Sequence, residues 1–266
     1  MLRLIASDLD GTLLQNGAQS LTERAAEQIR CLQEQGVIFA AASGRQYPNL
    51  QRLFGGLSEQ MAFICENGAY VVYRGEEIAS VPMERSLGLE IMRDIYSMEG
   101  CEILLSGKNT SYLQPKSEEY LHRMKNIVKN NVTVVEDIMK VEEPFLKISV
   151  CRLEGIGEVA EHFHTAFGHR AKATVSGFAW LDFTAENVNK GTALTALQQK
   201  LSITPEETMV FGDNYNDLDM FSCAAESYVM ESAVLEVKAY AKAEAACVEE
   251  VLDRLLAEET QKGGLK

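Results

Sequence analysis

Two aspartates near the start of the chain, Asp8 and Asp10, are the side chains best suited to chemistry. They follow the apolar run 2–6 and are followed at once by Gly11 and Thr12. A short apolar run of this kind predicts a buried strand of a parallel sheet, and side chains two residues apart on a strand point to the same face. We therefore expect both carboxylates in the crevice at a strand's carboxyl end, where open α/β sheets bind ligands.

This pair of acids suggests two chemical roles. Asp8 is a candidate nucleophile or metal ligand, and Asp10 is a candidate general acid and base, because carboxylates serve as covalent nucleophiles in phosphoryl transfer. The alternative is an Asx-type turn with two solvated acids. The residues downstream favour the chemical interpretation.

The composition sets limits on the class of protein. The chain has 266 residues, of which 46% are hydrophobic and 24% charged, so it can form one or two globular domains with a sizeable core. Its formal net charge of -14 disfavours nucleic acid and anionic membranes as partners. An acidic protein can still bind an anionic substrate where local cations and a metal reverse the field.

The cysteines and the hydropathy predict a cellular location. No two of the six cysteines have the spacing of a metal site or a redox motif, and most lie in apolar segments, as expected for small core residues in a reduced cytosol. We find no signal-like segment before the first strand and no apolar run of membrane-spanning length. We therefore expect a soluble, cytoplasmic protein.

The order of segments predicts a domain interrupted by an insertion. Strands at 37–42 and 61–65 alternate with helices, which is typical of a parallel sheet. From residue 84 the pattern changes to helices with paired strands, which indicates an α+β unit with an antiparallel sheet. The first pattern resumes with a helix at Lys190 and a buried strand at 208–211. We predict a core domain from 1–83 and 186–266, with an inserted cap domain at 84–185.

Polar residues follow several of these strands and are expected to share one pocket. The acids Asp8, Asp10, Asp213 and Asp217 would repel one another, since two unit charges 4 Å apart cost about 4 kcal/mol at an effective dielectric of about 20. A cation is almost required, and oxygen ligands without Cys or His favour Mg²⁺ over zinc. Lys190 adds a charge suited to a phosphoryl group. Ser43 and the Gly44 amide, at a strand-to-helix turn, are candidate donors to phosphate oxygens.

The residues also carry a resemblance to a known family. The chain resembles haloacid-dehalogenase (HAD) superfamily phosphatases, specifically the Cof-type group (subclass IIB). The motifs that match it, in order, are Asp8-Leu9-Asp10-Gly11-Thr12, Ser43-Gly44-Arg45, Lys190 in Asn189-Lys190-Gly191, and Gly212-Asp213 with Asn216-Asp217. The resemblance covers nearly the whole chain. It implies an α/β fold with a Rossmann-like parallel-sheet core and an inserted α+β cap of the C2 type.

The resemblance also implies residue roles for a Mg²⁺-dependent phosphatase of small phosphorylated metabolites. Asp8 would attack phosphorus to give an aspartyl-phosphate, and Asp10 would protonate the leaving alcohol and then deprotonate the attacking water. The metal would be held by the Asp8 carboxylate, the Asp10 backbone carbonyl and Asp213, with Asp217 supporting it. The residues implied to position the phosphoryl group are Thr12, Ser43, Gly44, Lys190 and Asn216.

Several questions stay open at this point. Ser232 stands where family members often have Asn, which puts support near the metal in doubt. Arg45 is interpreted either as a substrate contact or as a support of its turn, and for Asn67 a structural role is favoured over a ligating one. A phosphotransferase or phosphomutase on the same core is an alternative function, as is a phosphate-ligand sensor without turnover. Retention of both Asp8 and Asp10 argues against the sensor, because a pure binder needs no Asp10. The sequence identifies neither the substrate nor the oligomeric state.

Overall fold

The computed structural model describes residues 2–263, which form two compact units. Unit 1 comprises residues 2–44, 50–79 and 189–263, so both ends of the chain contribute to it. Unit 2 comprises residues 45–49 and 80–188. No helix in residues 2–263 has both the length and the apolar character needed to cross a membrane.

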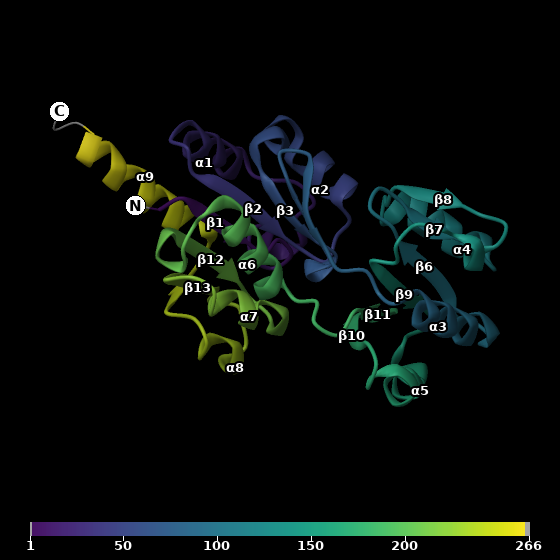
Figure 1. Ribbon diagram of the computed structural model, residues 1–266. Helices are drawn as coiled ribbons and strands as arrows, with labels where there is room; N and C mark the ends of the chain where they lie inside the picture. The colour runs from purple at the N-terminus through teal and green to yellow at the C-terminus, as the bar shows by residue number, and fades with distance from the viewer. Residues whose placement is uncertain (1, 264–266) are drawn as a thin grey trace. The chain divides into compact units, whose positions relative to one another are not determined.

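Unit 1 is built on an eight-stranded sheet (Figure 1). The strands, in their order across the sheet, are β14 (Ala243–Ala245), β13 (Glu226–Met230), β12 (Thr208–Gly212), β1 (Leu4–Ser7), β2 (Ile38–Ala42), β3 (Ala62–Cys65), β4 (Tyr70–Tyr73) and β5 (Glu76–Ser80). From β14 to β3 all neighbours are parallel, whereas β4 is antiparallel to β3. The predicted parallel core is confirmed, and β1 lies near its middle.

Helices connect the parallel strands. Those connecting or following strands of this sheet are α1 (Glu23–Glu34), α2 (Tyr47–Phe54), α6 (Lys190–Leu201), α7 (Leu218–Phe221), α8 (Leu235–Lys238) and α9 (Val248–Gly263), with 3-10 turns η1 (Gln15–Gly17), η2 (Gly55–Gln60), η3 (Glu66–Gly68), η6 (Pro205–Glu207) and η7 (Tyr215–Asp217). In α1 the Thr22 hydroxyl accepts a hydrogen bond from the Ala25 amide, which satisfies one N–H at the start of the helix.

The core of unit 1 explains the apolar runs in its sequence. Alternate residues of β1, such as Leu4 and Ala6, pack with Val210 of β12 and with Leu194 and Leu197 of α6. All four residues of β1 are buried. Burial on both faces is expected for parallel strands covered by helices, and it leaves the carboxyl ends of the strands as the place for polar side chains.

Unit 2 contains a six-stranded sheet, mostly antiparallel. In order, its strands are β10 (Lys172–Gly177), β11 (Trp180–Thr184), β9 (Lys147–Cys151), β6 (Glu102–Ser106), β7 (Ser111–Leu113) and β8 (Val132–Val134). Its helical segments are α3 (Arg85–Ser97), α4 (Glu118–His122), η4 (Arg123–Ile127), η5 (Ile138–Lys140) and α5 (Gly157–Phe167). The predicted α+β organisation is confirmed, with two differences: η4 is a π-helix, and β8 pairs with β7 in parallel.

Candidate functional site

The candidate site lies at the carboxyl end of β1, in unit 1. Asp8 directly follows this strand and is only 6% exposed. Its backbone N–H donates to the Phe211 carbonyl of the neighbouring β12 at 2.9 Å, so the parallel pairing extends to the catalytic candidate itself. The two strands that flank β1 are β12 and β2. Side chains that follow these three strands therefore meet at one edge of the sheet.

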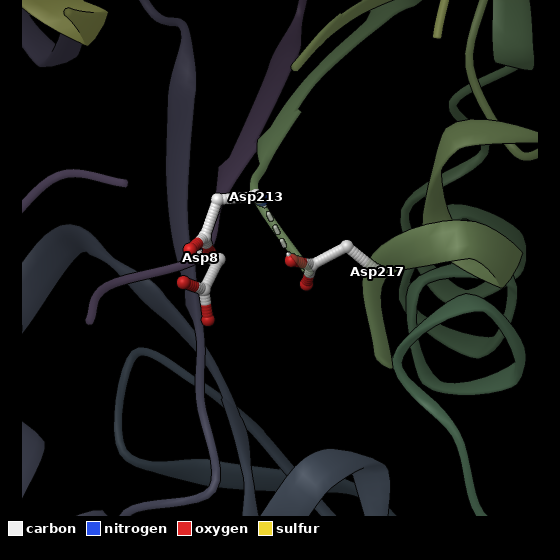
Figure 2. A group of neighbouring side chains, drawn as sticks. All are labelled: Asp8, Asp213 and Asp217. Atoms are coloured by element: carbon white, nitrogen blue, oxygen red, sulfur yellow. Dashed lines mark hydrogen bonds between the residues drawn. The ribbon is translucent and has the colours of Figure 1, made fainter. Parts of the chain in front are cut away.

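Three carboxylates gather at this edge although they are far apart in the chain. One carboxylate oxygen each of Asp8, Asp213 and Asp217 lies within 4.8 Å of the other two (Figure 2). Asp213 follows β12, and Asp217 closes the short turn η7. Three of the four acids expected to share one pocket are thus brought together around the end of β1.

Lys190 places an ammonium group among these acids. It is the first residue of α6 and has no exposed surface. Its Nζ donates to Oδ1 of Asp8 at 2.5 Å and to Oδ1 of Asp217 at 2.7 Å. Burial disfavours the charged form of Lys190, but the charges of Asp217 and Asp8 outweigh burial and raise its pKa. The lysine is therefore held as a cation between two carboxylates.

The negative charge exceeds what one lysine can balance. Burial, together with the charges of Asp217 and Asp213, raises the pKa of Asp8 to about 8 even though Lys190 acts in the opposite direction. Burial and the charge of Asp217 also raise the pKa of Asp213. A second cation would relieve this repulsion, and three carboxylates offer the hard oxygen ligands that Mg²⁺ prefers. The donor set therefore fits Mg²⁺.

The carboxylates differ in how many hydrogen bonds their oxygen atoms accept from the protein. Asp217 is fully buried, and its Oδ2 accepts the backbone N–H groups of Asp213 and Asn214 at 3.0 and 3.1 Å, while Oδ1 accepts from Lys190. Its carboxylate thus fixes the loop that carries Asp213. Oδ1 of Asp213 accepts a hydrogen bond from the Thr12 hydroxyl at 3.0 Å. Thr12, expected beside phosphate, contacts a candidate metal ligand in this structure.

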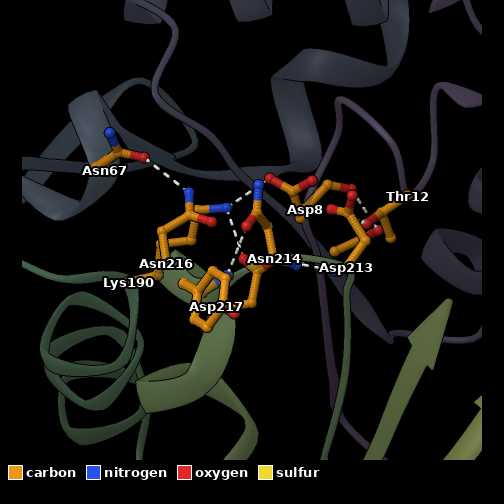
Figure 3. A network of polar contacts seen from close by, with 10 residues as sticks. Asp8, Thr12, Asn67, Lys190, Asp213, Asn214, Asn216 and Asp217 are labelled. Carbon is orange, nitrogen blue, oxygen red and sulfur yellow. Dashed lines mark hydrogen bonds and ion pairs between the residues drawn. The ribbon is translucent and has the colours of Figure 1, made fainter. Parts of the chain in front are cut away.

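The remaining predicted residues lie on neighbouring loops. Asp10 is exposed, and its carboxylate does not belong to the group of close carboxylates found among the described residues. Ser43 and Gly44 follow β2, and Ser43 is 2% exposed. Asn216 lies in η7, and its Nδ2 donates to Oδ1 of Asn67 at 3.3 Å (Figure 3). The structure thus gives Asn67, for which the sequence favours a structural role, a contact with a predicted phosphate-binding residue.

The sequence left the roles of Arg45 and Ser232 open. Arg45 is grouped with unit 2. Ser232 is exposed in the turn that follows β13. The sequence also gave no sign of the role of Asn214, whose Oδ1 accepts the Tyr215 amide at 2.8 Å and caps η7.

Comparisons with known proteins agree with the fold and the motifs. The family model of haloacid dehalogenase-like hydrolases matches residues 5–252. The chain is 29% identical over 264 residues to the 5-amino-6-(5-phospho-D-ribitylamino)uracil phosphatase of Escherichia coli (strain K12), covering 97% of each chain. It is 26% identical to the HMP-PP phosphatase of Escherichia fergusonii, covering 90% of this chain and 88% of that one.

A solved structure shows the same fold over nearly the whole chain. The protein SMU.1108c from Streptococcus mutans UA159 is similar, with a TM-score of 0.82 and 29% identity over 97% of this chain and 100% of that chain. The predicted fold class is confirmed by this likeness and by the family match. Because the family model spans most of the sequence, the chain belongs to the haloacid dehalogenase-like hydrolases.

Proposed function

We propose that this chain is a Mg²⁺-dependent phosphatase that hydrolyses small phosphorylated metabolites, such as sugar phosphates, through an aspartyl-phosphate. The phosphatase class rests on the family match and on full-length relatives that carry phosphatase names. The metal, the intermediate and the kind of substrate are the proposed parts. The observation that supports them best is the excess of carboxylates over ammonium groups around Asp8, at the end of a central strand.

In the first step, an oxygen of the Asp8 carboxylate forms a bond to phosphorus while the bond from phosphorus to the ester oxygen breaks. Asp10 gives its proton to that leaving oxygen, so an alcohol departs and Asp10 becomes a carboxylate. The exposure of Asp10 agrees with contact to a substrate that enters from solvent. Lys190 holds the Asp8 carboxylate through its 2.5 Å hydrogen bond and so fixes the direction of attack.

In the second step, water attacks phosphorus and the bond to Asp8 breaks. Asp10 takes the proton of that water, which restores both aspartates. Residues proposed to hold the phosphoryl group through both steps are Thr12, Ser43, Gly44, Lys190 and Asn216. Mg²⁺, when bound by the Asp8 carboxylate, the Asp10 backbone carbonyl and Asp213, with Asp217 supporting, neutralises charge on the phosphoryl oxygens.

The domain division and the location belong to the same proposal. Residues 1–83 and 186–266 would carry the catalysis, and residues 84–185 would act as a cap that contributes to substrate choice. A reducing, cytoplasmic location is supported by the six cysteines, all of which are free.

A panel of phosphorylated metabolites and p-nitrophenyl phosphate, assayed with and without Mg²⁺, tests this proposal. We expect phosphate release that requires Mg²⁺ and is abolished in Asp8→Asn. The exposed Asp219, two residues beyond Asp217 in α7, offers a matched control, since Asp219→Asn removes a charge close to the site in sequence. Turnover that persists in Asp8→Asn would exclude the aspartyl-phosphate, and transfer of phosphate to an added sugar would favour the phosphotransferase alternative.

A further inference from the structure

We infer that Asn67 is a positioning residue of the phosphate site, and that the turn η3 holds in place three loops that carry predicted phosphate-binding residues. This inference rests on the proposed function, because it assigns a role toward the same phosphoryl group. It is carried by the conformation of the turn and by three separate contacts within unit 1.

The conformation of the turn is the first observation. Glu66 and Asn67 both have positive φ angles, 52° and 57°, although neither is glycine. Two successive residues in the left-handed region are unfavourable, and such conformations persist only where the surroundings fix them. The surroundings of η3 are three loops of the site.

The first contact joins η3 to the loop after β2. The backbone N–H of Asn67 donates to the Ser43 carbonyl at 2.9 Å. A Cβ placed on Gly44 would lie 3.1 Å from Nδ2 of Asn67, which is tighter than ordinary packing. The missing side chain of Gly44 therefore lets the Asn67 amide lie across the end of β2.

The second contact reaches the loop after β12. Oδ1 of Asn67 accepts the hydrogen bond from Nδ2 of Asn216 at 3.3 Å, as Figure 3 shows. In the sheet, β12 and β3 are separated by β1 and β2, and neighbouring strands lie about 4.8 Å apart. The two amides therefore join loops from either side of the strand that ends in Asp8.

The third contact is with the N-terminus of α6. Gly68 has a φ of 112°, and a Cβ on it would collide with the carbonyl oxygen of Asn189. Asn189 caps α6 through its Oδ1, which accepts the Thr192 amide at 2.7 Å, and it directly precedes Lys190. The turn η3 thus packs against Asn189, the N-cap residue that fixes the start of α6 at Lys190.

These contacts suit a residue that acts through others. Asn67 fixes the amide of Asn216 and the loop of Ser43, and η3 supports the start of α6. Side chains that hold ligating residues in place typically change activity 10–100-fold when removed. We expect this positioning role to be lost when the Asn67 side chain is removed, even if the backbone of η3 keeps its conformation.

The variant Asn67→Gly separates the effect of the side chain from that of the backbone. Glycine adopts a φ of 57° without strain, so the substitution removes the side-chain amide and leaves the turn free to keep its conformation. With p-nitrophenyl phosphate and Mg²⁺ we expect kcat/KM to fall about 10–100-fold. Asn16 is the matched control: its φ and ψ of 55° and 30° resemble the 57° and 22° of Asn67, glycine follows both, and Asn16 is exposed. Asn16→Gly should leave kcat/KM within twofold of the unchanged protein.

Two further variants test whether Asn67 acts through Asn216. If it does, the double variant Asn67→Gly with Asn216→Ala should be no worse than Asn216→Ala alone, since contacting residues are not additive. Asn67→Asp keeps the acceptor for Asn216 but adds a negative charge beside the site. Its kcat should stay within threefold while KM for the phosphate ester rises at least fivefold, and this variant carries the test if Asn67→Gly does not fold.

The outcomes separate this inference from the proposed function. Full activity of Asn67→Gly alongside inactive Asp8→Asn would overturn the role of Asn67 and leave the phosphatase mechanism standing. If no substrate turns over, binding of inorganic phosphate in the presence of Mg²⁺, measured by calorimetry, gives the same comparison. At least tenfold weaker binding in Asn67→Gly supports the inference, and equal binding overturns it.

Discussion

Each unit of the molecule buries a lysine beside a carboxylate, but the group of three close carboxylates found in residues 2–263 lies in unit 1. In unit 1, Lys190 has no exposed surface and is surrounded by the acids Asp8, Asp213 and Asp217. Three carboxylates therefore face one ammonium group.

In unit 2, Lys147 forms an ion pair with Asp182. Its Nζ lies 3.6 Å from Oδ2 of Asp182, and both side chains are 10% exposed. The other carboxylate oxygen, Oδ1, accepts a hydrogen bond from the Ser149 hydroxyl at 2.6 Å. The Asp182 carboxylate thus has both a charged partner and a hydroxyl donor.

The difference between these two charged clusters indicates which buried charges mark a functional site. A balanced buried pair contributes little to stability beyond what apolar residues would, because desolvation offsets the attraction. An unbalanced cluster costs free energy in the absence of a ligand, and such clusters collect at functional sites. The excess charge of unit 1 is therefore the feature that a bound cation would neutralise.

Removal of the Lys190 ammonium group should have the largest effect on catalysis. Lys190→Met keeps much of the side-chain volume but leaves Asp8 and Asp217 without their shared donor. We expect kcat to fall about 10²–10³-fold, as on loss of other preorganised donors, measured by steady-state kinetics with folding checked by circular dichroism. Lys200→Met, an exposed change at the other end of α6, is the control. Equal kcat values for the two variants would contradict the comparison.

The position of the acidic cluster around Lys190 could be predicted from sequence, because the order of parallel strands leaves few places where their polar ends can meet. Parallel strands place their carboxyl ends at one edge, so apolar runs ending before Asp8, Ser43 and Asp213 predict one site. The helix starting at Lys190 follows from its N-cap, Asn189, and from the periodic apolar residues after it. These are local patterns with a fixed geometric consequence.

Contacts that depend on loop conformation could not be predicted in this way. Oδ2 of Asp217 accepts two backbone amides, and Thr12 donates to Asp213, yet no periodicity encodes either contact. Asn67 reaches Asn216 only because Glu66 and Asn67 both adopt positive φ. The short strands of the β4–β5 segment and of β13 and β14 also lack strong alternation, so their pairing depends on tertiary context.

Mg²⁺ should change the stability of unit 1 by a comparable amount to the loss of a buried ion pair. A ligand that binds only the folded state at a hundredfold excess over Kd adds about 2.7 kcal/mol to the free energy of unfolding. We expect added Mg²⁺ to raise the thermal midpoint by several degrees at constant ionic strength, and EDTA to reverse it. Asp213→Asn should lose most of this shift. The same shift in that variant would argue against Asp213 as a ligand.

Loss of the Lys147–Asp182 ion pair of unit 2 should change stability. Lys147→Met leaves the Asp182 carboxylate buried with only part of its partners, and we expect a loss of about 3 kcal/mol in the free energy of unfolding. Replacing both members, as in Lys147→Met with Asp182→Leu, should restore most of that loss because no charge stays buried. Denaturant titration measures both. A loss of kcat as large as that in Lys190→Met, with unchanged unfolding, would show that Lys147 serves catalysis instead.

An exposed ion pair provides the smallest expected effect and the baseline for both clusters. Arg170 contacts both carboxylate oxygens of Glu90, at 3.0 and 2.9 Å, with the two side chains 40% and 51% exposed. The hydrogen bond from Arg170 lowers the pKa of Glu90. Its contribution to stability is therefore present above the unfolded pKa, about 4.3, and is lost as pH falls through the lower folded value. Glu90→Gln should shift the thermal midpoint at pH 7 by no more than about 1–2 °C. The shift should vanish once the pH falls below the lowered pKa of the folded state, where the carboxyl group is protonated in both states. A larger shift at pH 7, comparable with that of Lys147→Met, would mean that burial is not what separates the pairs.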